Sequence, residues 1–267
     1  MMERTIAQIL SKHGIEVFGL LPAEKAQMLK PPMEGVRAYI MLLLPYHTAG
    51  VERNVALFAC FPDYHALTRE LLGEVCAELE VCFPDETFKA SVDSSPIAEV
   101  NCAAECGLGA IGDNGLLINE RYGSYCFIAE IATTLELPPL KRDVGTFGCL
   151  KCGACVSACP HGALGENGFN ADKCVSHVSQ KKGMLTPEEE KMITSADFIW
   201  GCDRCQEACP LNAGLGDTRL ECFKATAPIV NEDMVNNPGF FNSSVFAWRG
   251  KQTILRNIAL QKRNNSK

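Results

Sequence analysis

The chain has 267 residues, with 25 Lys and Arg against 32 Asp and Glu, which gives a formal net charge of −7. Hydrophobic residues make up 47% and charged residues 21%, which excludes a disordered chain and predicts one or two folded domains. The longest apolar run, over residues 39–45, is about a third of the ~20 residues that a membrane helix needs. The charged N-terminus lacks the pattern of a secretion signal. We therefore expect a cytoplasmic protein without a membrane segment.

The first 140 residues have the pattern of a mixed α/β domain. Apolar residues recur at helical spacing over residues 5–13 and 63–81, which predicts two amphipathic helices. A short apolar run over residues 36–45 has the length of a strand, and residues 124–135 alternate imperfectly, as in a mostly buried strand. We therefore predict an α/β domain over residues 1–140.

Two further segments follow a pair of consecutive prolines that breaks the pattern. Residues 141–222 carry clustered cysteines and are rich in loop-forming residues, and residues 223–267 form a basic C-terminal tail. No acid follows Asp233, and residues 252–260 have the spacing of a terminal helix. The tail could bind an anionic partner such as RNA, or it could be the solvated face of a docked helix.

The chain contains fifteen cysteines, far above an ordinary share. Without an export signal a disulfide framework is the weaker interpretation, because cytosolic reductants keep thiols reduced. Eight of the cysteines cluster between residues 149 and 209, which favours metal binding. We predict that the other seven are small, buried hydrophobic side chains: Cys60, Cys76, Cys82, Cys102, Cys106, Cys126 and Cys222.

The clustered cysteines form one complete and one shortened copy of a ferredoxin-type run. In the complete run, gaps of two, two and three residues precede a final Cys-Pro, which is the spacing of bacterial ferredoxins. Its members are Cys149, Cys152, Cys155 and Cys159. The shortened run again ends in Cys-Pro, and an isolated cysteine between the copies supplies the missing thiol. These four are Cys202, Cys205, Cys209 and the isolated Cys174.

The last cysteine of such a run ligates the other cluster, and this crossover assigns two ligand sets. The first set is Cys149, Cys152, Cys155 and Cys209, and the second is Cys202, Cys205, Cys174 and Cys159. Zinc is the alternative, since paired C-x2-C spacings also occur in zinc ribbons. A four-cysteine run that ends in Cys-Pro and is then repeated favours two 4Fe–4S clusters, which would act as an electron relay.

A glycine-rich segment over residues 107–112 matches the dinucleotide-binding pattern G-x-G-x-x-G. That function requires a strand before the glycines and a helix after them. Here the preceding residues 98–106 have a helical pattern, and the following residues 113–115 form a turn sequence. We therefore predict a glycine-rich loop and not a nicotinamide cofactor site.

Asp93 follows a short predicted strand in the segment Ser91–Pro96. An aspartate in this setting commonly caps a turn. Near a redox centre it could instead donate a proton, provided that its surroundings raise its pKa.

Taken together, these segments resemble the epoxyqueuosine reductases, a family of cobalamin-dependent iron–sulfur enzymes that complete queuosine in tRNA. The similarity extends over residues 36–215 and also covers the tail over residues 245–260. The segments that carry it, besides the cysteine runs, are Asp63-Tyr64-His65, VDSSPIAE (92–99), GLGAIGDNGLL (107–117), GSYCFIAEI (123–131), DKCVSH (172–177) and WGCDRCQEACPLN (200–212).

The resemblance implies an N-terminal cobalamin-type α/β domain followed by a ferredoxin-like double-cluster domain. Electrons would pass through both clusters to cobalt and remove an epoxide oxygen, with Asp93 in the position of the family's proton donor. By position, the implied cobalamin contacts are Leu117 and Ile128, through their backbone, with Ser176 and Asp203 near the clusters.

The resemblance also implies partners. A flavodoxin- or ferredoxin-like reductant would supply electrons, and tRNA is the expected substrate, although segments that help longer members to hold tRNA are missing here. A smaller epoxide is the other substrate that fits. The alternative from a different class is a non-catalytic, double-cluster electron-transfer protein.

Overall fold

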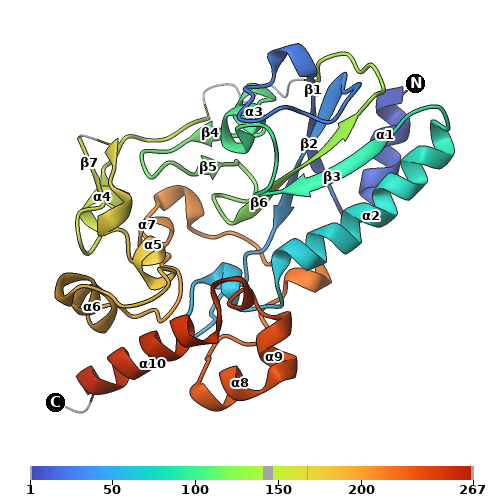
Figure 1. The fold of residues 1–267 in the computed structure, drawn as a ribbon. Helices are drawn as coiled ribbons and strands as arrows, with labels where there is room; N and C mark the ends of the chain where they lie inside the picture. The colour runs from blue at the N-terminus through green and yellow to red at the C-terminus, as the bar shows by residue number, and fades with distance from the viewer. Residues whose placement is uncertain (1, 141–146, 167, 266–267) are drawn as a thin grey trace. The chain divides into compact units, whose positions relative to one another are not determined.

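The computed structural model describes residues 2–140, 147–166 and 168–265 and divides into two compact units (Figure 1). The first comprises Met1–Pro45 and His65–Leu150, and the second comprises Tyr46–Tyr64 and Lys151–Lys267. The chain therefore leaves the first unit once, early, to contribute a short segment to the second. The prediction of α/β structure followed by a double-cluster region agrees with this arrangement.

The first unit is built on a four-stranded antiparallel sheet in the order β1-β2-β6-β3. The strands are β1 (Val17–Pro22), β2 (Ala38–Pro45), β6 (Cys126–Thr133) and β3 (Phe88–Val92). Every residue of β1 and β2 is buried, because elements cover both faces of the sheet. The strands predicted within residues 36–45 and 124–135 are confirmed as β2 and β6.

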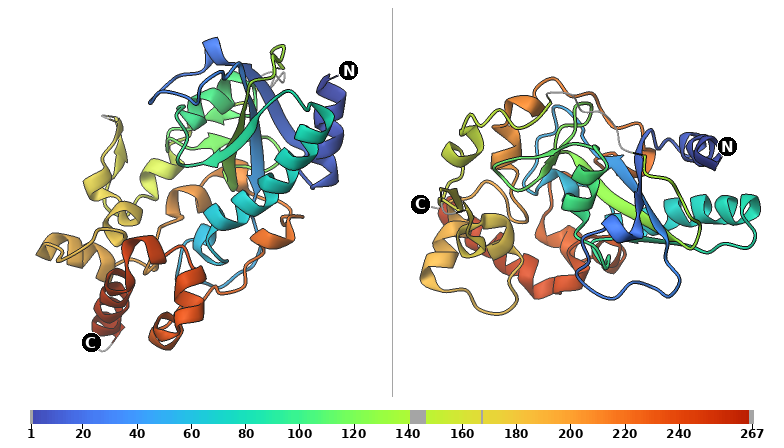
Figure 2. Two further views of the ribbon diagram at one scale, coloured as in Figure 1. Left: turned by 45° about the vertical axis from the view of Figure 1, so that its right-hand side comes forward. Right: turned by 90° about the horizontal axis from the view of Figure 1, so that it is seen from above.

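Helices α1 (Met2–Lys12) and α2 (Tyr64–Cys82) lie on one face of the sheet (Figures 1 and 2). Both were predicted from apolar spacing. The other face carries α3 (Glu99–Glu105) and a small hairpin of β4 (Ala110–Ile111) and β5 (Leu117–Ile118). The face that holds α3 is where the acidic side chains described below gather.

The glycine-rich segment joins α3 to this hairpin. As predicted, a helix precedes the glycines and a turn follows them, between β4 and β5. A dinucleotide site would have a strand before the glycines and a helix after them. Gly109 is required by packing, because a Cβ there would lie 2.4 Å from the carbonyl oxygen of Ile118.

The second unit consists of short helices joined by loops. They are α4 (Ala154–Ser157), α5 (Val175–Ser179), α6 (Pro187–Thr194), α7 (Arg204–Glu207), α8 (Glu232–Asn236), α9 (Pro238–Ser243) and α10 (Lys251–Asn265). A two-stranded hairpin, β7 (Leu164–Gly165) with β8 (Gly168–Phe169), completes the unit. Its core includes the edge-to-face pair Trp200 and Phe246, both fully buried.

The C-terminal helix α10 is docked on α5 and α6 of this unit. The buried amide of Asn257 donates hydrogen bonds to the carbonyl oxygens of Ser179 (2.7 Å) and Ile199 (2.8 Å). Arg256 donates to the carbonyls of Lys181 and Gly183, so part of the tail's positive charge serves packing. The described part of the tail thus has the docked-helix arrangement. The last predicted basic residue, position 267, lies outside the described residues.

The predicted boundaries, 1–140, 141–222 and 223–267, differ from this division in two ways. Residues 46–64 belong to the second unit, and the tail is part of that unit and not a separate segment. The physical reason is that residues 46–64 form hydrogen bonds with the second cysteine loop, while α10 packs on α5 and α6. The predicted boundary at 140/141 borders residues 141–146, which lie outside the described residues. Across the described ranges, no helix is long and apolar enough to cross a membrane.

Candidate functional site: cysteine loops and an acidic turn

The two cysteine runs fold into similar loops, each followed by a one-turn helix. Helix α4 contains Cys155 and helix α7 contains Cys205, and the two helices pack against each other. In the first loop Lys151 (φ 52°) and Gly153 (φ 71°) have left-handed backbone conformations. In the second, Gly201 has a φ of 72°. The repeat seen in the sequence is therefore also a repeat in the structure.

The thiols of the second predicted ligand set lie close enough to influence one another electrostatically. Burial raises the pKa of Cys202 to about 11, and the neighbouring Cys174 and Cys159 add to that shift. Burial likewise raises the pKa of Cys205 to about 12, with Cys202, Cys174 and Cys155 contributing. Cys159 from the first run thus lies near Cys202 of the second, and Cys155, from the other predicted set, lies near Cys205, so the division into two ligand sets stays a prediction.

Backbone donors point at two of these sulfurs. The N–H of Ala163 donates to the Sγ of Cys159 over 3.2 Å, and the N–H of Arg204 donates to Cys202. Such bonds stabilise a thiolate and are among the features that tune iron–sulfur clusters. The donor set therefore fits cluster ligation. Within the described ranges, no three His, Cys, Asp or Glu side chains form a group that could hold a single metal ion.

The four cysteines of the first predicted ligand set are distributed over the two compact units. Cys149 falls at the end of the first unit, while Cys152, Cys155 and Cys209 fall in the second. Cys152 is exposed and the others are half-buried. None of the fifteen cysteines, each in the described part of the chain, forms a disulfide.

Of the seven remaining cysteines, four are buried as predicted: Cys60, Cys76, Cys102 and Cys106. Cys126 and Cys222 are half-buried, whereas Cys82, at the end of α2, is exposed and contradicts the prediction. The end of the helix explains the exception, because Cys82 is the last residue of α2 and lies beyond Leu79, the last buried residue of that helix.

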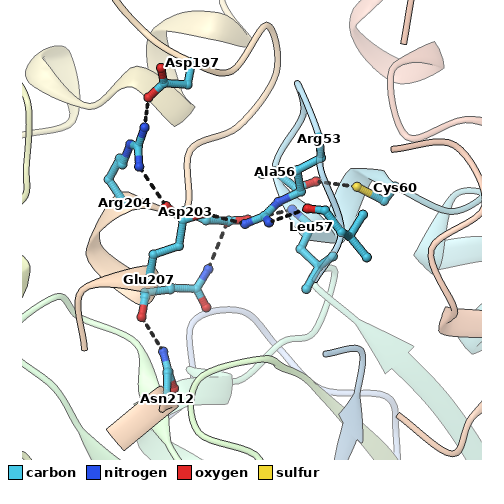
Figure 3. A network of polar contacts seen from close by, with 11 residues as sticks. Arg53, Ala56, Leu57, Cys60, Asp197, Asp203, Arg204, Glu207 and Asn212 are labelled. Carbon is cyan, nitrogen blue, oxygen red and sulfur yellow. Dashed lines mark hydrogen bonds and ion pairs between the residues drawn. The ribbon is translucent and has the colours of Figure 1, made fainter. Parts of the chain in front are cut away.

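A buried ion pair fastens residues 46–64 to the second cysteine loop (Figure 3). Asp203 is 1% exposed, and its Oδ2 accepts hydrogen bonds from the backbone N–H of Leu57 (2.6 Å) and from Arg53 (3.0 Å). Its Oδ1 accepts one from Gln206 (3.2 Å), and Arg53 also binds Glu207 (2.7 Å). Burial raises the pKa of Asp203, and the Leu57 N–H and the Arg53 guanidinium oppose that shift.

Two of the predicted cobalamin contacts, Asp203 in this network and Ser176 in α5, have hydrogen-bond partners within the second unit. Asp203 uses its carboxylate within the second unit, and its contact with cobalamin stays a prediction. Ser176, in α5, is half-buried, and its carbonyl accepts hydrogen bonds from Ser179 (3.0 Å) and Gln180 (3.1 Å). Its hydroxyl lies 3.5 Å from the Gln180 amide.

In the first unit, Asp93 leaves the sheet directly after β3. Val92 pairs with Ala129 of β6, and Asp93 then adopts a left-handed conformation with a φ of 56°. Its side chain is 50% exposed, and its Oδ2 lies 3.3 Å from the Nε2 of His65, the second residue of α2. The sequence prediction did not give His65 a role, although it belongs to the Asp-Tyr-His segment that carries the family resemblance.

The other two predicted contacts also lie in the first unit. Ile128 is the residue of β6 just past its last pair with β3, so it lies opposite the point where Asp93 leaves the ladder. Leu117 is 4% exposed, and its side chain belongs to the hydrophobic core beneath α3. The side chain of Leu117 is thus used in the core, and its backbone contact with cobalamin stays a prediction.

Two acids beside Asp93 were missed by sequence reasoning. Glu130 lies in the middle of β6, and Glu99 begins α3. Burial raises the pKa of both carboxyl groups, and the nearby charge of Asp93 adds to the shift. A signal was present, because Glu130 is a charged residue at the centre of a strand predicted to be buried.

Comparison with known proteins agrees with this geometry. Residues 148–212, which include all eight clustered cysteines, match the model of the 4Fe–4S double cluster binding domain. This part of the chain therefore binds two 4Fe–4S clusters, as predicted from the spacing.

The similarity to known proteins extends beyond this domain to nearly the whole chain. The chain is 31% identical over 275 residues to the epoxyqueuosine reductase of Bacillus cereus, a match that covers 95% of this chain and 70% of that protein. The chain belongs to the epoxyqueuosine reductase family. The Lactococcus garvieae epoxyqueuosine reductase is 33% identical over 205 residues, covering 73% of this chain. This second match spans only 57% of the relative, little more than half of its length.

The fold is that of solved epoxyqueuosine reductases. A crystal structure of epoxyqueuosine reductase with an epoxyqueuosine-modified tRNA-Tyr stem loop superimposes with a TM-score of 0.83 and 22% identity. The match covers 98% of this chain and 81% of that one. The family's fold is therefore present over both compact units.

Proposed function

We propose that this protein is a reductase that removes the oxygen of an epoxide, and that its substrate is epoxyqueuosine in tRNA. The observation that carries the proposal is the position of Asp93. It is turned out of the sheet beside His65, within a chain that belongs to the epoxyqueuosine reductase family along most of its length.

The reaction would consume two electrons and two protons, converting an epoxide into an alkene and water. We assign the two clusters to the eight cysteines in the crossed sets given above. We assign a corrinoid to the first unit, where Ile128 and Leu117 would contact it through the backbone, and place Ser176 and Asp203 on the cluster side. When bound, these groups supply the electrons that break the carbon–oxygen bond.

The protein itself would contribute a proton, which the carboxyl group of Asp93 would hold beside the substrate. Asp93 would donate to the departing oxygen, and a general acid so placed contributes about 100- to 10,000-fold in rate. His65, at 3.3 Å from Asp93, would orient that carboxyl group and return a proton to it from solvent. Both side chains are partly exposed, which suits a group that must meet a substrate and then be reprotonated.

The partners follow from the same chemistry. A tRNA anticodon stem loop is the proposed substrate, supported by the tRNA complex of the structurally similar reductase. A low-potential flavodoxin- or ferredoxin-like protein is the proposed electron donor. We place the protein in the cytoplasm as part of this proposal, because cysteines that form no disulfide and reduced clusters both need a reducing compartment.

A non-catalytic electron carrier is the competing function, favoured by the double-cluster domain alone. Anaerobic purification followed by reconstitution with cobalamin distinguishes the two, since the carrier would not retain a corrinoid through gel filtration. Iron, sulfide and cobalt would be measured per chain, and the modified stem loop would be assayed for loss of one oxygen atom by mass spectrometry. A protein that holds both clusters, retains no corrinoid and leaves the nucleoside unchanged would be the carrier.

A further inference from the structure

Glu130 is at an unfavourable position for a charged group. It lies in the central part of β6, 1% exposed, with Met41 of β2 and Ser91 of β3 as its cross-strand neighbours. A lone carboxylate that is buried in this way loses its hydration and needs strong compensation. Its environment should therefore show how the charge is avoided.

The carboxyl group of Glu130 forms a hydrogen bond with that of Glu99, at the start of α3. Two carboxylate ions cannot form such a bond, because neither has a proton to donate. The contact requires one proton between the two acids. In addition, Glu99 Oε1 and Glu130 Oε2 are both buried without a hydrogen-bond partner, which makes a second negative charge still less favourable.

The same two acids hold the turn that carries Asp93. The backbone N–H of Asp93 donates to Glu99, and the hydroxyl of Ser95 donates to Glu130. The Ser95 Oγ in turn accepts from the N–H of Ile97 at 3.1 Å, just before α3. The left-handed conformation of Asp93 is uncommon for a residue with a side chain, so it depends on contacts of this kind.

We propose that Glu99 and Glu130 share a single proton and act as positioning residues for Asp93. The shared proton keeps the two acids in contact, and the pair anchors the turn between β3 and α3 to the centre of the sheet. The effect on turnover rests on the proposed function of Asp93, whereas the shared proton can be tested without any substrate.

The surroundings of the pair explain why it holds a proton. The titratable groups that face it are Asp93 from the end of β3, Tyr39 from β2 and Cys102 from α3, and His65 faces it through Asp93. Of these, Asp93 is the acid whose negative charge would oppose a second charge on the pair, while Tyr39 and Cys102, whose pKa values burial raises, are neutral neighbours. When the pair loses its proton, two carboxylates repel, and the turn that presents Asp93 should loosen.

Infrared spectroscopy tests the shared proton directly. The folded protein at pH 7 should show the carbonyl band of a protonated carboxylic acid, with a shift in D2O. The band should be absent in Glu99→Gln and in Glu130→Gln, because the amide then donates to a single carboxylate. It should persist in Glu105→Gln, a control at the exposed end of the same helix. A band that is missing from the wild type, or that is unchanged in both Gln variants, overturns the proposal.

Hydrogen exchange tests the anchoring of the turn. Glu99→Ala removes the acceptor of the Asp93 N–H and should speed exchange in residues 93–97 about fivefold, the worth of one hydrogen bond. Glu99→Gln retains an acceptor and should exchange within about twofold of the wild type. Should the Ala variant fail to fold, Glu130→Ala, which leaves the Asp93 acceptor in place but removes its support, gives the same readout. Unchanged exchange in the variant that folds overturns the positioning role.

The pH profile of turnover separates positioning from a purely structural effect. In the wild type, turnover should fall on the alkaline side as the pair loses its proton. Glu130→Gln cannot lose that proton, so its alkaline limb should be absent or moved by at least about one pH unit. An identical limb in both proteins overturns the positioning role. If no variant and no wild type reduces the epoxide, the proposed function fails, while the infrared result still decides whether the proton is shared.

Discussion

Two buried carboxyl groups in this protein, Asp203 and Glu130, are equally inaccessible at 1% exposure but have opposite surroundings. Asp203 faces the guanidinium of Arg53 and the N–H of Leu57, which compensate a full negative charge. Glu130 faces Glu99, with Asp93 close by, so its charge is avoided by a proton.

The difference shows two uses of a buried acid. At Asp203 the charge is paired and hydrogen-bonded, and it holds residues 46–64 against a cysteine loop, which is a structural role. At Glu130 the acid neighbours would make the site sensitive to pH, next to the residue proposed to donate a proton. Changes to the two sites should therefore differ in what they affect: folding at the first, and turnover and pH dependence at the second.

The largest effect is expected at Asp93, the acid that Glu99 and Glu130 are proposed to position. Asp93→Asn should reduce kcat by about 100- to 10,000-fold, because an amide cannot donate a proton to the departing oxygen. Cluster content and melting temperature should remain those of the wild type, since the side chain is 50% exposed. Turnover of the modified stem loop under anaerobic conditions measures this, and wild-type turnover in the variant would remove Asp93 from the mechanism.

Breaking the ion pair in the second unit should instead affect folding. Arg53→Ala leaves the charge of Asp203 buried without its cation and should reduce the free energy of unfolding by about 3 kcal/mol. Denaturant unfolding measures the loss. The matched control is Arg37→Ala, at the exposed pair with Glu136, which should have no measurable effect. Equal stabilities of the two variants would show that the buried ion pair does not stabilise the fold.

The acid pair should give stability a particular pH dependence. Burial raises the pKa of Glu99 from 4.5 to about 8 and that of Glu130 to about 7, with neighbouring acids contributing. Each acid then binds in the folded state a proton that it has released in the unfolded state. Stability therefore falls as pH rises from 4.5 toward 8, by up to about 1.4 kcal/mol per pH unit for each acid that is still protonated. Glu130→Gln should flatten this slope relative to Glu105→Gln, as measured by unfolding at several pH values. A slope that is equally steep in both variants would contradict the difference drawn between the two sites.

The smallest effect is expected at Gln206, the third residue that donates a hydrogen bond to Asp203. Gln206→Ala removes the hydrogen bond to Oδ1 and leaves the Arg53 and Leu57 contacts in place. It should cost about 1 kcal/mol in the free energy of unfolding, the worth of one buried hydrogen bond. A loss as large as that of Arg53→Ala would mean that the guanidinium is not the main compensation for this charge.

Much of the fold could be predicted because it depends on local patterns. Helices α1, α2 and α10 and strands β2 and β6 follow from apolar spacing, and the cysteine runs predict the cluster domain without reference to tertiary structure. The prediction gave no role to residues 46–64 and did not join the tail to the second unit. Nothing in either segment's own sequence states where its side chains are buried, and their anchors, Asp203 and Ser179, lie far along the chain.

The sequence by itself determined the cofactor chemistry, because cluster ligands are specified by residue type and by spacing within short loops. It also placed Asp93 at the end of a strand. Only the tertiary structure decided which side chains accompany that aspartate, because sheet register places Glu130 beside the turn and packing brings His65 and Glu99 to it. Whether a buried acid is charged or shares a proton depends on these neighbours, which come from distant parts of the chain.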